Sequence, residues 1–147
     1  VGERIVLSFV ACAQTRLMWE EARRYGHERH AFGKPLLANQ VWTHRLADVR
    51  TTLEAAEALT ERALELQLRG ERCDSEVSMA KLFTCETAID AARTCAQIFG
   101  GMSHMEECLM ARLYRDCLAF TIGAGSSEMM REIIARNEGL AVEGRRG

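Results

Sequence analysis

The chain has 147 residues, a length that fits one domain with a buried core, and 48% of its residues are hydrophobic. Its formal net charge of -2 argues against a nucleic-acid-binding protein, which normally shows a basic balance or a basic stripe. No apolar run approaches the roughly 20 residues of a membrane-spanning helix. With a single proline and 11 glycines, the composition predicts an ordered and mostly helical domain.

The first predicted helix runs from Glu3 to about His30, and its first half is so apolar that we expect it to be buried on several sides. Gly33 and Pro35 mark the turn that follows. The second helix carries apolar residues at spacings of three and four, and it ends at Arg69-Gly70. Its apolar stripe is Trp42, Leu46, Val49, Leu53, Ala56, Leu59, Ala63 and Leu66.

A third helix, capped by Asp74 or Ser75, has a stripe of small residues that predicts close packing against its neighbours. The stripe is Val77, Ala80, Thr84, Ala88, Ala91, Cys95 and Ile98. We expect a shorter helix from Glu106 to about Phe120, and a final helix from Ser126 or Ser127 to about Ala141. The predicted fold is therefore all-α: an up-down four-helix bundle with an additional short helix over residues 1–141, followed by a flexible tail, 142–147.

Six cysteines and four histidines occur without metal-ligand or C-x-x-C spacing, so no metal site is predicted. Most cysteines fall at apolar positions of predicted helices. We interpret them as reduced core residues, with a set of structural disulfides as the alternative.

Two glycine-containing loops could approach a ligand. In Ile122–Glu128, flexible glycines lead into a serine-capped helix whose free amides suit an anion or a polar cofactor. In Gln97–Gly101, two glycines end the third helix. Either loop could instead be an ordinary helix end, because glycine is common there.

Five motifs occur in one order and spacing: Arg29-x-x-Phe32-Gly33-x-Pro35-Leu36-x-x-x-Gln40, Leu46-Ala47-Asp48-Val49, Met79-Ala80-Lys81, Gln97-Ile98-Phe99-Gly100-Gly101 and Arg115-Asp116. From about Glu3 to Asn137 the chain resembles the C-terminal helical domain of the flavin-dependent acyl-CoA dehydrogenases. Members of that family carry an N-terminal helical domain and a middle β-domain before this one. The resemblance implies FAD as cofactor, an acyl-CoA substrate and a trans-2-enoyl-CoA product. It also implies that the isolated fragment is inactive.

In the family, a carboxylate removes the α proton while the β hydrogen leaves as hydride to the flavin. Many members place this glutamate in the loop at the position of Ala124 here, but isovaleryl-CoA and long-chain types carry it where Glu3 stands. The resemblance therefore implies that Glu3 is the catalytic base, made more basic by burial beneath flavin and thioester. Read from its position alone, Glu3 is a first-turn glutamate favoured by the helix dipole.

The resemblance also implies a substrate site at Arg4, Gly123, Ala124 and Gly125. Arg4 matches an arginine beside substrate and base, with a surface ion pair as the alternative. Gly123 stands where medium-chain members carry a tyrosine, so it would enlarge the acyl pocket without deciding between branched and long acyl groups. The alternative is that the turn itself requires glycine at this position.

Nine residues are implied to bind FAD: Arg29, Phe32, Gln40, Gln97, Gly100, Gly101, Ser126, Ser127 and Glu128. Arg29 would bind the pyrophosphate of a neighbouring subunit's FAD, because a planar guanidinium suits bidentate phosphate binding. Sharing of FAD between subunits implies a homodimer or a tetramer.

The resemblance further implies electron-transfer flavoprotein as acceptor, a role in fatty acid or branched-chain amino acid catabolism, and a cytoplasmic or mitochondrial-matrix location. A competing hypothesis remains open, in which the chain is a non-catalytic helical assembly module derived from that family.

Overall fold

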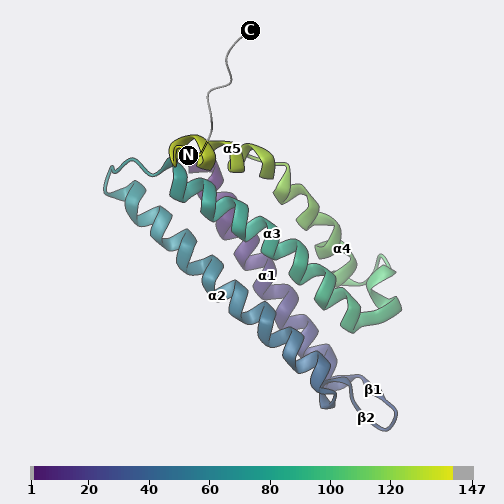
Figure 1. Ribbon diagram of the computed structural model, residues 1–147. Coiled ribbons are helices and arrows are strands. Elements are labelled where there is room, and N and C mark those ends of the chain that lie inside the picture. The colour runs from purple at the N-terminus through teal and green to yellow at the C-terminus, as the bar shows by residue number, and fades with distance from the viewer. Residues whose placement is uncertain (1, 141–147) are drawn as a thin grey trace.

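The computed structural model describes residues 2–140, which are almost entirely helical (Figure 1). Three long helices, α1 (Gly2–Glu28), α2 (Gln40–Leu68) and α3 (Asp74–Phe99), are followed by α4 (Leu109–Asp116) and α5 (Ser127–Asn137). Short 3-10 segments cover Leu36–Ala38, Gly100–His104 and Cys117–Thr121. The predicted all-α bundle is confirmed, and none of the helices in the described part of the chain is long and apolar enough to cross a membrane.

Helix α3 is the centre of the bundle, with contacts to α1, α2, α4 and α5. Every residue of its predicted small-residue stripe is buried, from Val77 to Ile98. Alanines and a cysteine on this face let the neighbouring backbones approach closely, as expected. The cysteines are free, and five of the six are buried. Burial raises the pKa of the Cys95 thiol to about 12, which keeps it protonated and unreactive at neutral pH.

Between α1 and α2 the chain forms a small hairpin, which the sequence pattern did not predict. Strand β1 (His30–Ala31) pairs antiparallel with β2 (Lys34–Pro35), and His30 lies opposite Pro35. Phe32 and Gly33 make the tip, both in the left-handed region with φ of 53° and 79°. The hairpin lies at one end of the bundle, whereas α5 and the start of α1 lie at the other end (Figure 1).

Several predicted helix ends are wrong by a few residues. Asp74 is already helical and Cys73 occupies the N-cap position of α3, without a side-chain cap bond. Helix α4 begins at Leu109 because residues 106–108 form a turn rather than a helical start. Helix α5 ends at Asn137 and is followed by Gly139 at φ 69°, which terminates helices. Residues 141–147, including the predicted tail, lie outside the described residues.

The first half of α1 is less buried than we expected. Val6 and Val10 are 63% and 46% exposed, and Phe9 is 39% exposed. Only one side of this helix meets α2 and α3, so its other side remains open within the chain.

Candidate functional site

The predicted site residues form two groups at opposite ends of the bundle. The loop end comprises the first turn of α1 and residues 122–128. The hairpin end comprises the end of α1, the β1–β2 hairpin and residues 97–105. Glu3 and Arg29 are separated by 26 helical rises along or just beyond α1, a distance of about 39 Å. The two groups therefore cannot meet around one ligand within a single chain.

At the loop end, two cationic side chains hold consecutive carbonyl groups of the glycine turn. Arg4 Nε donates to the carbonyl oxygen of Ala124 at 3.3 Å, and Lys81 Nζ donates to that of Gly125 at 2.6 Å. Lys81 projects from α3 and is completely buried. Burial lowers the pKa of Lys81, and the nearby Arg4 guanidinium lowers it further. These bonds join α1 and α3 to a turn that lies 120 and 44 positions away in the sequence.

The turn has an uncommon backbone conformation. Ala124 has a φ of 54°, a left-handed value that residues other than glycine rarely adopt. Gly125 has a φ of 100°, and a Cβ atom there would lie 2.8 Å from Cε of Met130. Glycine is thus required at 125 for its backbone conformation, and a Cβ there would also displace the end of the Met130 side chain.

Gly123 differs from Gly125, because its φ lies outside the left-handed region. A Cβ atom at 123 would lie 3.3 Å from the Ala119 carbonyl oxygen and 3.9 Å from Cδ2 of Leu7. Backbone conformation does not require glycine here, although the neighbouring backbone would have to shift by a few tenths of an ångström to accommodate a Cβ. The contact also shows that Leu7, one turn after Glu3 on α1, lies next to the turn.

Helix α5 starts directly after the turn, as predicted from its serines. Ser126 is the N-cap, and its Oγ accepts from the Met129 N–H at 3.4 Å. Glu128 is exposed, and its pKa lies below the ordinary value because its own backbone N–H and the Ser126 hydroxyl bond to its carboxylate. Ser127 is buried, and its hydroxyl has no hydrogen-bond partner among residues 2–140. A polar atom of this kind is rare and suits a ligand that arrives from outside.

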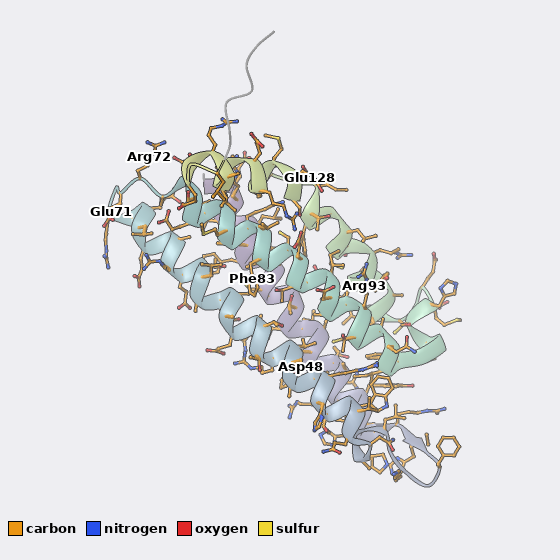
Figure 2. All side chains as sticks on the ribbon, viewed as in Figure 1. Asp48, Glu71, Arg72, Phe83, Arg93 and Glu128 are labelled. Carbon is orange, nitrogen blue, oxygen red and sulfur yellow. The ribbon has the colours of Figure 1, made fainter. Side chains whose placement is uncertain are left out.

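An open groove of about 510 Å³ runs beside the start of α5. Its walls come from α3, the Cys117–Thr121 segment and the first turn of α5, and include Ile122, Ser126, Ser127 and Glu128. Figure 2 shows Glu128 at the same end of the bundle as Arg72, whereas Arg93 lies farther along α3 toward the other end. Glu3 and Arg4 do not line this groove.

Glu3 lies in the first turn of α1 and is exposed. No group within residues 2–140 covers its carboxylate, so the expected burial beneath flavin and thioester is not met inside this chain. Its neighbour Arg4 is half-buried and bonds to the turn, rather than forming the alternative surface ion pair.

At the hairpin end, the fold brings Arg29 together with Gly100 and Gly101 around an open groove of about 930 Å³. The floor of this groove includes Tyr25 and Phe99, whose rings stack at 4.3 Å. Gln97 does not line this groove. It lines a second groove of about 550 Å³, together with Arg93 and His104, and the two grooves share Gly100 and Gly101.

Phe32 and Gln40 lie apart from these grooves. Phe32 at the hairpin tip is 102% exposed, and Gln40 at the start of α2 is also exposed. The chain therefore collects only some of the predicted cofactor residues at this end, and the others project outward from it.

Lys81 is a site residue that the sequence analysis marked only as part of the Met79-Ala80-Lys81 motif, without a role in a site. A further signal was that only two of the 19 basic residues of the chain are lysines, and that this one stands beside Ala80 of the buried stripe of α3. Within residues 2–140, nowhere do three or more His, Cys, Asp or Glu side chains lie together so that they could hold a metal ion.

Comparison with known proteins decides the family. The family model described as "Acyl-CoA dehydrogenase, C-terminal domain" matches residues 1–139. The chain belongs to the acyl-CoA dehydrogenase family. The resemblance inferred from the five motifs is thus confirmed.

Among curated relatives, an acyl-CoA dehydrogenase of Bacillus subtilis is 38% identical over 90% of this chain and 35% of its own length. The mitochondrial long-chain specific acyl-CoA dehydrogenase of Sus scrofa is 34% identical over 91% of this chain and 31% of its own length. A caffeyl-CoA reductase-Etf complex subunit of Acetobacterium woodii is 35% identical over 79% of this chain and 31% of its own length. The chain spans about a third of the length of these relatives.

Solved structures show the same fold. The acyl-CoA dehydrogenase from Geobacillus kaustophilus superposes with a TM-score of 0.90 at 36% identity, over 92% of this chain and 36% of the other. An FAD complex of PigA superposes with a TM-score of 0.86 at 26% identity, over 90% of this chain and 35% of the other.

Proposed function

We propose that the chain is the C-terminal helical domain of an FAD-dependent acyl-CoA dehydrogenase, with Glu3 as the catalytic base. The observation that carries this proposal is the hydrogen bond from Arg4 to the carbonyl of Ala124. It joins the residue after Glu3 to the turn at 124, which supports the proposal that the two alternative positions of the family's carboxylate lie near each other. A carboxylate moved from position 124 to position 3 would still face the same region.

In the proposed reaction, the Glu3 carboxylate accepts the α proton of the thioester, and the β hydrogen leaves with its bonding electron pair as the C=C bond forms. FAD, when bound, supplies the acceptor for that hydride. Arg4 holds the turn at 124 against the first turn of α1. Because Glu3 is exposed within this chain, the middle β-domain and the substrate would have to cover it. An isolated fragment that lacks this domain is therefore expected to be inactive.

FAD is supported as the cofactor by the solved FAD complex that shares this fold and by residues suited to its phosphates. Arg29 offers a guanidinium at the edge of a large groove, and the start of α5 offers free N–H groups beside the unpartnered Ser127 hydroxyl. Arg29 lies about 39 Å along α1 from Glu3, at the opposite end of the bundle from the start of α5, which means that one chain would contact two FAD molecules. We propose a homodimer, or a dimer of dimers, in which each hairpin end reaches the partner's FAD; the fully exposed Phe32 suits this role.

The acyl-CoA substrate and the acceptor are parts of the same proposal. An electron-transfer flavoprotein as acceptor is supported by the relative named as a subunit of a reductase-Etf complex. At Gly123 a tyrosine ring would stand beside Leu7, so glycine leaves room for the acyl group near α1. This room admits a branched or a long acyl chain, in a fatty acid or a branched-chain amino acid pathway of the cytoplasm or mitochondrial matrix.

The alternative, a non-catalytic assembly module, is favoured by the exposed apolar side of α1 at Val6, Phe9 and Val10. Such a face suits packing against another domain or chain whether or not chemistry occurs. A module would show no flavin absorbance even after reconstitution with FAD.

The deciding experiment assays the full-length protein with straight and branched acyl-CoAs and an artificial electron acceptor. We expect Glu3→Gln to lower kcat/KM by about 100- to 10,000-fold, the range of general base catalysis. Glu20→Gln, an exposed glutamate on the same helix, is the matched control and should stay within about twofold of the parent protein. Undiminished activity of Glu3→Gln would remove the base assignment, and a parent protein inactive with every acyl-CoA would favour the assembly module.

A further inference from the structure

Lys81 is unusual because its ammonium group is completely buried without a carboxylate partner. Within residues 2–140 its Nζ forms no ion pair and has one hydrogen bond, to the Gly125 carbonyl at 2.6 Å. The charged groups that act on it are Arg4, a like charge, and the carboxylates of Glu128 and Glu86, neither of which forms an ion pair with it. Taking a lone charge out of water is unfavourable, and a methionine would fill similar space in the core. Packing therefore does not explain why this position holds a lysine.

The bond that Lys81 makes controls the orientation of a peptide group. In a trans peptide the C=O and the following N–H point in opposite directions, and the described chain contains no cis peptide bond. Since Lys81 holds the Gly125 carbonyl and Arg4 holds the Ala124 carbonyl, the N–H groups of Ser126 and Gly125 point away from these two cations. Neither N–H donates to an acceptor within residues 2–140. Two adjacent, free N–H groups are thereby presented on the side of the turn away from Lys81 and Arg4.

The same bonds sustain a strained conformation. Ala124 at φ 54° has a backbone that a relaxed alanine seldom adopts, at a cost of about 1 kcal/mol or more. Such a conformation persists only when surrounding contacts determine it. Lys81 and Arg4 supply those contacts from two different helices.

We infer that Lys81 is a positioning residue for the turn: its buried ammonium fixes the Gly125 carbonyl and so keeps the Gly125 and Ser126 N–H groups facing the ligand side. The ligand part of this inference rests on the proposed function, because those amides would act on the bound thioester or cofactor. The positioning itself is a property of the chain, and it can be measured without any turnover.

The test compares three variants of the full-length protein: Lys81→Met, Lys81→Arg and the control Thr84→Val. Thr84 is buried one turn further along α3, and its hydroxyl bonds within its own helix, so Thr84→Val perturbs the same core without touching the turn. The first readout is hydrogen exchange at the bonded amides that flank the turn, Gly123 and Met130. The second is kcat and KM with the best acyl-CoA.

We expect Lys81→Met to speed exchange at both amides at least tenfold and to lower kcat at least tenfold, with a smaller change in KM. Lys81→Arg keeps a cationic donor and should lie between Lys81→Met and the parent protein, whereas Thr84→Val should match the parent. A purely packing role would reverse this order, because methionine fits the lysine cavity better than the bulkier arginine.

Unchanged exchange in Lys81→Met would overturn the positioning role, whatever the activity. Faster exchange with unchanged kcat and KM would overturn its link to the ligand. If the parent protein dehydrogenates no acyl-CoA while Lys81→Met still loosens the turn, the proposed function fails and the positioning role stands. Should Lys81→Met not fold, Lys81→Gln, whose amide ends short of the Gly125 carbonyl, is subject to the same criteria.

Discussion

The two ends of the bundle differ in how much of their structure comes from the chain itself. At the loop end, Arg4 and Lys81 reach from two helices to adjacent carbonyls, and Ser126 caps the helix that follows. At the hairpin end, Phe32 projects fully into solvent and Arg29 is exposed at the rim of an open groove.

The difference indicates that the loop end is fixed before any partner arrives, while the hairpin end offers side chains to something outside the chain. Internal hydrogen bonds hold the turn in a strained conformation, which pre-organises it. Exposed aromatic and cationic side chains gain their interaction energy only when another surface or ligand covers them. Four predictions, in order of falling effect, test this comparison.

The largest effect should come from moving the carboxylate across the loop end. Glu3→Gln should lose about 100- to 10,000-fold in kcat/KM. Adding Ala124→Glu to that variant should raise kcat/KM again by at least tenfold, because the residue after Glu3, Arg4, bonds to the carbonyl of residue 124. Steady-state assays of the full-length protein measure both steps. A double variant as inactive as Glu3→Gln alone would show that the two positions do not address the same carbon atom.

At the hairpin end, Arg29→Ala should weaken FAD binding about 10- to 100-fold, the value of a charge-assisted hydrogen bond to phosphate. Flavin absorbance after dialysis measures this, with the exposed Arg62→Ala as control.

Hybrid dimers sharpen the same prediction. If each hairpin end serves the partner's FAD, a dimer of one Glu3→Gln subunit and one Arg29→Ala subunit has both defects in one site and none in the other. Such hybrids, isolated through two affinity tags, should show about half of the parent activity. Hybrids no more active than either variant would mean that Glu3 and Arg29 of the same chain serve the same site.

A packing prediction contrasts the two turns. Gly125→Ala should reduce the free energy of unfolding by about 2 to 3 kcal/mol, because a Cβ would meet Met130 at 2.8 Å and φ is 100°. Gly33→Ala, with φ 79° and open space around it, should lose only about 1 kcal/mol. Denaturant unfolding of both variants gives the values. Equal losses would mean that the loop end is no better packed than the hairpin tip.

The smallest effect concerns pH. The pKa of Lys81 is lowered by burial, so between its folded and unfolded pKa values the unfolded chain binds more protons. The free energy of unfolding attributable to this group therefore rises with pH across that interval. The destabilisation caused by the buried charge is largest below the interval. Relative to Lys81→Met, the parent protein should therefore gain free energy of unfolding as the pH rises from neutral toward 10. A shift in the opposite direction would mean that folding raises the pKa of Lys81, so that the buried ammonium is stabilised by its surroundings.

Local patterns predicted most of the fold because each depends on neighbours within one helix. The stripe from Val77 to Ile98 is buried as its spacing indicates, and Ser126 caps α5 as expected. Helix starts were less accurate: Asp74 is a good capping residue, yet Cys73 takes the N-cap position of α3 without a side-chain cap bond. The two-residue strands were missed since they have too few residues for any alternation.

The candidate site was predictable only in part. Glycines and serines marked the loop, and the family motifs marked Arg29 and Gly100, which the fold does bring together. The exposure of Glu3 and Val6 was not foreseen, because apolar or acidic character does not reveal which side of a helix meets another helix in this chain.

The sequence by itself determined the helical periodicity, the glycine stops and the family. Tertiary structure alone decided that a lysine of α3 and an arginine of α1 would meet at two adjacent carbonyls of one turn. The physical reason is range: periodicity reflects contacts between residues three or four apart, whereas these bonds span 44 and 120 positions and exist only once the antiparallel helices have packed.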